Sequence, residues 1–150
     1  MAEILFYHLT ESRMEEALPD LLQRSVARGW RVVVQTATPE RRDALDQHLW
    51  VYRDDSFLPH GTDRERDAPE QPIVLTMRDD NPNGAQVRFL VDGAALPDDV
   101  AGYERLVLLF DGADPDAVAA ARARWGEAKA RNLAATYWRQ NEEGRWERQG

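Results

Sequence analysis

The chain has 150 residues and a formal net charge of -8; 43% of its residues are hydrophobic and 31% are charged. These values are typical of a single globular domain with a core of its own. Because there is no cysteine, the sequence excludes disulfide bonds, thiolate nucleophiles and cysteine-based zinc sites. Its apolar runs are too short to cross a bilayer and no signal peptide is evident, so we expect a cytoplasmic protein without a membrane partner.

The charge is unevenly distributed along the chain. Residues 119–150 contain seven basic and four acidic side chains, whereas residues 1–118 contain 12 basic and 23 acidic ones. The acidic total argues against general binding to a phosphate backbone, which depends on clustered lysine and arginine. No predicted strand interleaves aromatic with basic residues along one face, and we therefore expect no direct tight binding to nucleic acid.

The first third of the chain alternates predicted strands and helices. Residues 3–9 form a short apolar run that is typical of a buried strand, and residues 12–29 place their apolar side chains on one helical face before a terminal glycine. Three consecutive valines within residues 30–36 predict a second strand, buried on both faces. A second helix follows over residues 38–50, where Thr38 is suited to the N-cap and a proline to the first helical position.

The rest of the chain continues this pattern. Asp114 is placed to cap a third helix, again with a proline after it. The order of strands and helices predicts an α/β fold with a mostly parallel central sheet. We expect one domain over residues 1–138 and a polar C-terminal tail over residues 139–150, with Trp146 placed to anchor it. The further predicted elements are strands at residues 72–77, 86–92, 105–112 and 133–138 and a helix at residues 114–132.

The sequence gives little support for an enzyme. No predicted strand is followed by the glycine-rich turn and lysine that hold phosphate groups. The three histidines, His8, His48 and His60, are too far apart in sequence to form a recognisable metal motif. Asp54 and Asp55 with His60 are a candidate site for a divalent cation, although acid pairs in loops are usually solvated turn residues. We therefore expect no catalytic residue, no cofactor and no metal.

Residues 54–71 form a long predicted loop, and loops of this length in compact domains are often functional. The loop contains the sequence SFLPHG, in which Phe57 and Leu58 precede Pro59 and His60. An aromatic side chain on a loop made rigid by proline is the kind of anchor that protein interfaces use. The alternative is that Phe57 folds back onto the edge of the sheet.

The third helix has a stripe of mixed character. At 100° per residue, Val118, Arg122, Trp125 and Lys129 lie within about 60° of each other, while alanines form a separate stripe toward the core. The two cations can hold carboxylates and the two apolar side chains can line a groove. The stripe therefore suits an acidic peptide that ends in an aromatic residue and a free carboxylate. The alternative is a solvated helix flank with Trp125 partly buried.

Several motifs together resemble one protein family. They occur in order along nearly the whole chain and are FYHL, GWRVVV, LDQHLW, DDSFLPHG, QPIVLT and ARARWGEAKARNLAATYW. This pattern resembles the chi subunit of bacterial DNA polymerase III holoenzyme. The resemblance implies a three-layer, Rossmann-like α/β/α fold without catalysis of its own. It also implies an adaptor that links the clamp loader to single-stranded DNA-binding protein.

The resemblance implies roles for both surface features. The family's arginine that binds the acidic C-terminal tail of single-stranded DNA-binding protein falls on Arg122, and its neighbouring aromatic residue falls on Trp125. A family lysine one turn earlier is replaced by Val118, and Lys129 is our candidate to compensate. The phenylalanine that contacts the psi subunit falls on Phe57, where a helicase could bind instead. The competing hypothesis is a small nucleotide-binding or metal-dependent enzyme, because fold alone does not decide function.

Overall fold

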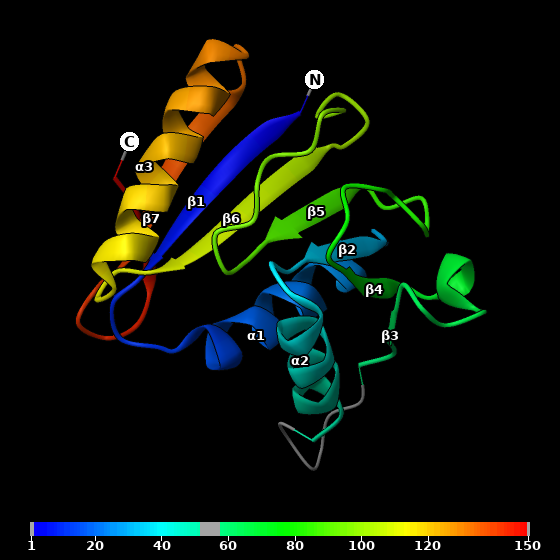
Figure 1. Ribbon diagram of the computed structural model, residues 1–150. Coiled ribbons are helices and arrows are strands. Elements are labelled where there is room, and N and C mark those ends of the chain that lie inside the picture. Colours follow the sequence, from blue (N-terminus) through cyan, green and yellow to red (C-terminus); the bar gives the residue numbers. More distant parts are fainter. Residues whose placement is uncertain (1, 52–57, 150) are drawn as a thin grey trace.

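The computed structural model describes residues 2–51 and 58–149, which form a sheet between two layers of helices (Figure 1). The strands are β1 (Glu3–Leu9), β2 (Val32–Gln35), β3 (Gly61–Thr62), β4 (Ile73–Thr76), β5 (Val87–Leu90), β6 (Arg105–Asp111), β7 (Ala134–Gln140) and β8 (Trp146–Arg148). Their order in the sheet is β3-β4-β2-β5-β6-β1-β7-β8. Neighbouring strands are parallel except for β7 and β8, so the mostly parallel sheet is confirmed.

The helices begin and end close to where the sequence indicated. They are α1 (Met14–Ala27), α2 (Pro39–Val51), α3 (Pro115–Ala130) and a short 3-10 helix, η1 (Ala68–Glu70). The Thr38 hydroxyl accepts a hydrogen bond from the N–H of Arg41 at 3.2 Å, and the Asp114 carboxylate accepts one from the N–H of Asp116 at 3.0 Å. Both predicted N-caps are therefore confirmed. After α1, Gly29 has a φ of +86°, a left-handed conformation that glycine adopts without strain.

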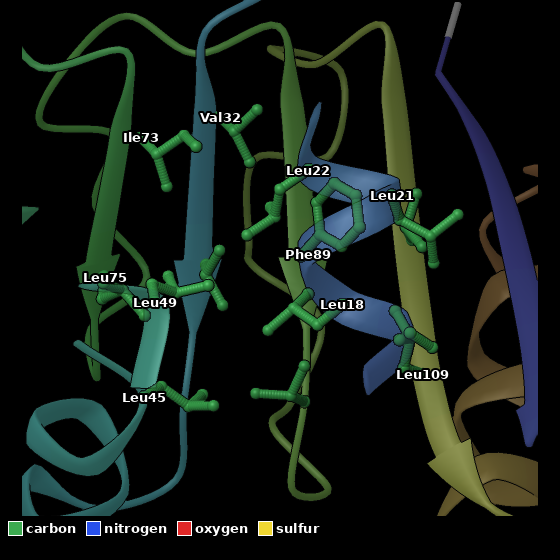
Figure 2. Close-up of a cluster of buried hydrophobic side chains, with 14 of the residues drawn as sticks. Leu18, Leu21, Leu22, Val32, Leu45, Leu49, Ile73, Leu75, Phe89 and Leu109 are labelled. Carbon is green, nitrogen blue, oxygen red and sulfur yellow. The ribbon is translucent and has the colours of Figure 1, made fainter. Parts of the chain in front are cut away.

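One core lies between the sheet and the helices α1 and α2. Figure 2 shows the leucines of α1, including Leu18 and Leu22, lying over Phe89 of β5, and those of α2 lying near Leu75 of β4. The strands β2, β4 and β5 are buried along their whole length. This agrees with the valine run of β2, which predicted a strand covered on both faces.

A second core lies between the sheet and α3, which packs on β6 and β7. The helix turns Ala121 and Ala128 toward the strands, and both are buried. Their small side chains let the helix lie close to the sheet. With α1 and α2 on one face and α3 on the other, the described chain is a three-layer α/β/α domain, as expected.

Arg88 of β5 is a fully buried arginine on the α3 face of the sheet. Its guanidinium donates to the Gln35 side chain at 2.6 and 3.0 Å, to the carbonyl of Asp80 at 2.7 Å and to the Tyr103 hydroxyl at 3.1 Å. It also donates to the carbonyl of Arg78. These bonds satisfy a buried charge that would otherwise be costly, and they hold the β4–β5 connection against the sheet.

The C-terminal segment is part of the sheet. β7 continues to Gln140, so the predicted boundary between a domain of residues 1–138 and a tail of residues 139–150 lies within this strand. β8 then pairs with β7, and Trp146 meets the ring of Tyr7 edge-on, with 4.7 Å between centroids. Trp146 therefore anchors the segment as predicted. The sequence of residues 139–150 predicted a tail because, apart from Trp146, its side chains are polar.

Candidate functional site

The α3 stripe, defined as Val118, Arg122, Trp125 and Lys129, lies on one continuous helix. Val118 and Trp125 pack against the core between the sheet and α3, whereas Arg122 and Lys129 are exposed. Two cations thus lie next to an apolar base, as the spacing predicted. The partial burial of Trp125 also agrees with the alternative of a solvated helix flank. Burial alone therefore does not decide between that flank and a groove that binds a peptide.

Trp125 is held in place by other aromatic rings. It meets Phe6 of β1 edge-on with 5.1 Å between ring centroids, and it meets Tyr137 of β7 at 6.3 Å. The Nζ atom of Lys129 lies 5.0 Å from the centroid of the indole ring, within the range of a cation–π interaction. The stripe therefore presents a fixed apolar surface with a positive charge at its side.

Arg122 is available to a ligand. Within residues 2–51 and 58–149 it makes no hydrogen bond and no ion pair. Burial raises the pKa of the Tyr137 hydroxyl, and the nearby charges of Arg139 and Arg122 oppose that rise. The two guanidinium groups therefore act on the same point of the surface, next to the ring that supports Trp125. Arg139 therefore adds positive charge on the face of the sheet that carries the α3 stripe.

Sequence reasoning did not place Tyr137, Arg139 and His8 beside the α3 stripe, although it considered His8 as a histidine of the first strand. Nδ1 of His8 is hydrogen-bonded to the Tyr137 hydroxyl, and the His8 ring lies 4.9 Å from that of Phe110. Burial and the charge of Arg139 lower the pKa of His8, which is therefore neutral near pH 7. The alternation along β7, which places Tyr137 and Arg139 on the same face as Ala135, is the signal that could have found the first two.

The predicted partner loop is only partly within the described residues, and Phe57 lies outside them. Leu58 is 4% exposed and belongs to the core under α1 and α2, while His60 is 3% exposed. The assignment of Leu58 and His60 as partner contacts therefore needs correction, because their side chains support the segment from inside. Phe57 and the half-buried Pro59 remain the predicted contact residues.

His60 is fully engaged with neighbouring oxygens. Its Nδ1 lies 2.6 Å from the carbonyl oxygen of Leu58. Its Nε2 lies 3.0 Å from the carbonyl oxygen and 3.2 Å from the carboxylate Oδ1 of Asp46, whose pKa is raised by burial. Asp54 and Asp55, the other members of the candidate cation site, lie outside the described residues. Within the described part of the chain, no group of three or more histidine, aspartate or glutamate side chains could hold a metal ion.

A cavity of about 650 Å³ lies where β5 and β6 end and α1 and α3 begin. Ligands of α/β proteins usually bind at this end of the sheet. Here Arg41 is already paired with Asp92 at 3.0 Å and with Glu15 at 3.3 Å, and the lining has five acidic and three basic side chains. An acidic lining repels phosphate groups, so the cavity gives no support to the nucleotide-binding alternative.

Comparison of the sequence with known proteins points to one family. The sequence model of the family described as "DNA polymerase III chi subunit, HolC" matches residues 1–136. The chain belongs to this family. A relative from Rickettsia prowazekii (strain Madrid E), named "Probable DNA polymerase III subunit chi", is 27% identical over 121 residues, which cover 74% of this chain and 71% of the relative.

Membership of the chi family supports a role as a subunit of the DNA polymerase III replisome in DNA replication. The matched residues include the complete α3 stripe and the segment around Phe57, and they end within β7. As for membranes, none of the helices formed by the described residues combines the length and apolar character needed to span one.

Proposed function

We propose that this chi subunit is a non-catalytic adaptor that links the clamp loader to the acidic C-terminal tail of single-stranded DNA-binding protein. The observation that carries the proposal is the exposed Arg122 beside the half-buried Trp125 on the α3 stripe. A tail that ends in acidic residues, an aromatic side chain and a free carboxylate has groups complementary to both. Recognition of such a peptide needs no catalytic group.

Each residue of the α3 stripe has a role in this proposal. Arg122 holds the terminal carboxylate with two parallel hydrogen bonds, which a guanidinium is shaped to make. The aromatic side chain of the peptide packs on Val118 and Trp125, and Lys129 attracts its acidic residues. Because Trp125 is already held by Phe6 and other rings, little side-chain freedom is lost on binding.

The second partner binds at the loop that carries Phe57. By family resemblance this partner is the psi subunit of the clamp loader, or a helicase on the same surface. Residues 58–60 lead directly into β3, which is the edge strand of the sheet, whereas α3 packs on β6 and β7. The described part of the second surface, at Pro59, therefore leads to the β3 edge and away from α3, which supports the proposal that both partners bind at once.

Calorimetric titration with a peptide that copies the acidic tail tests the proposal. The parent protein should bind it with roughly micromolar affinity, as is usual for a short segment that becomes ordered on binding. Arg122→Ala should weaken binding by about 1.5 to 3 kcal/mol, the usual range for a hydrogen bond to a charged group. Trp125→Ala should cost a similar amount and some stability. Arg66→Ala, at an exposed arginine near the β3 edge, is the charge-matched control and should bind like the parent.

The peptide itself supplies a second control. A copy that lacks the final aromatic residue should bind more weakly, since it cannot use Val118 and Trp125. Added salt should weaken the parent more than Arg122→Ala, because only the parent keeps that charge pair. Equal affinity for the two peptides, or an Arg122→Ala variant that binds like the parent, would show that the α3 stripe is a solvated helix flank.

A further inference from the structure

The sheet has an open area on the face opposite α3. On that face α1 packs on β2 and β6, and α2 packs on β3 and β4. The part over β7 and β8 is less covered: Figure 1 shows α1 and α2 gathered below the other half of the sheet, and α1 borders this part where Glu16 and Asp20 line a hollow with Trp146. The side chains of β1, β7 and β8 on this face are therefore partly accessible to a ligand.

The side chains in this open area include three aromatic rings side by side. The register of β1 with β7 places Tyr7 next to Trp138, and their rings stack at 6.3 Å with 27° between the planes. Trp146 of β8 meets Tyr7 edge-on at 4.7 Å. All three side chains are partly exposed. Tyr7 thus contacts both tryptophans, and the three rings form one cluster on β1, β7 and β8.

Two arginines and a fourth aromatic residue lie on the same face, toward the start of β6. The ring of Trp30 lies 3.9 Å from the guanidinium carbon of Arg28 and 5.2 Å from that of Arg105, as distances to the ring centroid. Arg105 alternates along β6 with Val107 and Leu109, which belong to the core that Tyr7 packs against, so Arg105 and Tyr7 lie on the same face of the sheet. We call these six residues, Tyr7, Arg28, Trp30, Arg105, Trp138 and Trp146, the aromatic strip.

The charge around the aromatic strip differs between its two ends. Glu3 pairs with Arg105 at 2.7 Å. Glu16 and Asp20 line a hollow beside the β8 end together with Arg24 and Arg145, so the charges at that end balance. The positive end is therefore the one at the start of β2, where an anionic group would bind best.

We propose that the aromatic strip binds single-stranded nucleic acid weakly and without sequence preference. Unpaired bases stack on aromatic side chains, and phosphates bind to arginine; sheet faces with both are a common platform for single strands. No single strand interleaves aromatic with basic residues, as expected, because the members of the aromatic strip come from several strands and the α1–β2 connection. The net charge of -8 still argues against tight binding.

An anisotropy titration with a labelled oligothymidylate at low salt tests this proposal. The dissociation constant should lie between about 10⁻⁴ and 10⁻⁵ M, the range of non-specific binding. Trp138→Ala should weaken binding about tenfold, as expected for the loss of one stacked base. Arg28→Ala should weaken it too and reduce the salt dependence by about one counterion. A duplex of the same length should bind less well, because its bases are not free to stack.

Matched variants separate this surface from the α3 stripe. Trp125→Ala, on the opposite face, and the charge-matched Arg66→Ala should keep oligonucleotide affinity within error of the parent. Thermal unfolding and binding of the tail peptide are the measurements that show whether Trp138→Ala is folded. Arg28→Ala changes an exposed side chain and tests the aromatic strip independently. The proposal is overturned if the parent does not bind, if both strip variants bind like Arg66→Ala, or if the tail peptide displaces the oligonucleotide.

Discussion

The aromatic side chains that support both proposed surfaces are half-buried. Trp125 is held by Phe6 on the α3 face, and Trp138 is stacked on Tyr7 on the other face. A ring in this position is fixed by its neighbours and still offers a flat apolar surface, so little side-chain entropy is lost when a ligand covers it. Hydropathy alone assigns such residues to the core, and only their contacts show which part of the ring stays accessible.

His8 predicts a pH dependence of stability. Burial, followed by the charge of Arg139, lowers the pKa of His8 in the folded protein, whereas an unfolded histidine titrates near 6.5. As the pH falls below about 6.5, the unfolded chain takes up a proton that the folded protein does not yet bind. The free energy of unfolding should therefore decrease from about pH 6.5 down to the folded pKa. Urea titrations at several pH values should show that His8→Asn removes this part of the decrease.

A second substitution tests whether burial or the hydrogen bond to Tyr137 lowers the pKa of His8. Tyr137→Phe removes the hydroxyl that is hydrogen-bonded to His8 and leaves the ring buried. Because burial is the first cause of the lowered pKa, this variant should keep the pH dependence of the parent. If the His8→Asn variant loses stability with pH as the parent does, another group is responsible.

Elements differ in how well the sequence predicted them. The starts of α2 and α3 were predictable because Thr38 and Asp114 are local signals that need no other segment. The strands β3 and β8 were missed because two or three residues show no periodicity and form a strand only by pairing. The order of the strands in the sheet could not be predicted from the sequence for a related reason, because it depends on contacts between segments that are far apart in the chain.

Gln140 joins two elements, and this predicts how the C-terminal segment contributes to stability. Its Oε1 accepts hydrogen bonds at 3.0 to 3.1 Å from the backbone N–H groups of residues 10, 11 and 12, which lead into α1. A chain that ends at Asn141 loses β8 but keeps Gln140, and a chain that ends at Arg139 loses both. The shorter chain should be less stable by about a further 1 to 3 kcal/mol, because these donors lose their partner.

Urea unfolding of the two truncated chains measures this difference. Gln140→Ala in the full chain is the matched control and should reproduce most of it, because the substitution removes the acceptor while β8 stays in place. Two truncated chains of equal stability would mean that water replaces Gln140 at no cost.

At the scale of the whole molecule, the described residues of the three proposed surfaces lie in different parts of one sheet. The α3 stripe is on one face, the aromatic strip is on the other, and the segment after Phe57 leads into the β3 edge. The first and third were predicted because each is carried by one continuous segment. The aromatic strip joins residues of β1, β6, β7, β8 and the α1–β2 connection, so it becomes visible only when the sheet is assembled.

This separation predicts that the partners can be lost one at a time. Phe57→Ala should weaken binding of the psi subunit or of a helicase by about 2 kcal/mol, the cost typical of an aromatic interface anchor, and leave the affinity for the tail peptide unchanged. Arg122→Ala is the reciprocal variant and should weaken only the tail peptide. Calorimetry with each partner and thermal unfolding of each variant provide the measurements. A Phe57→Ala variant that melts well below the parent and keeps its partner affinity would instead assign Phe57 to the core.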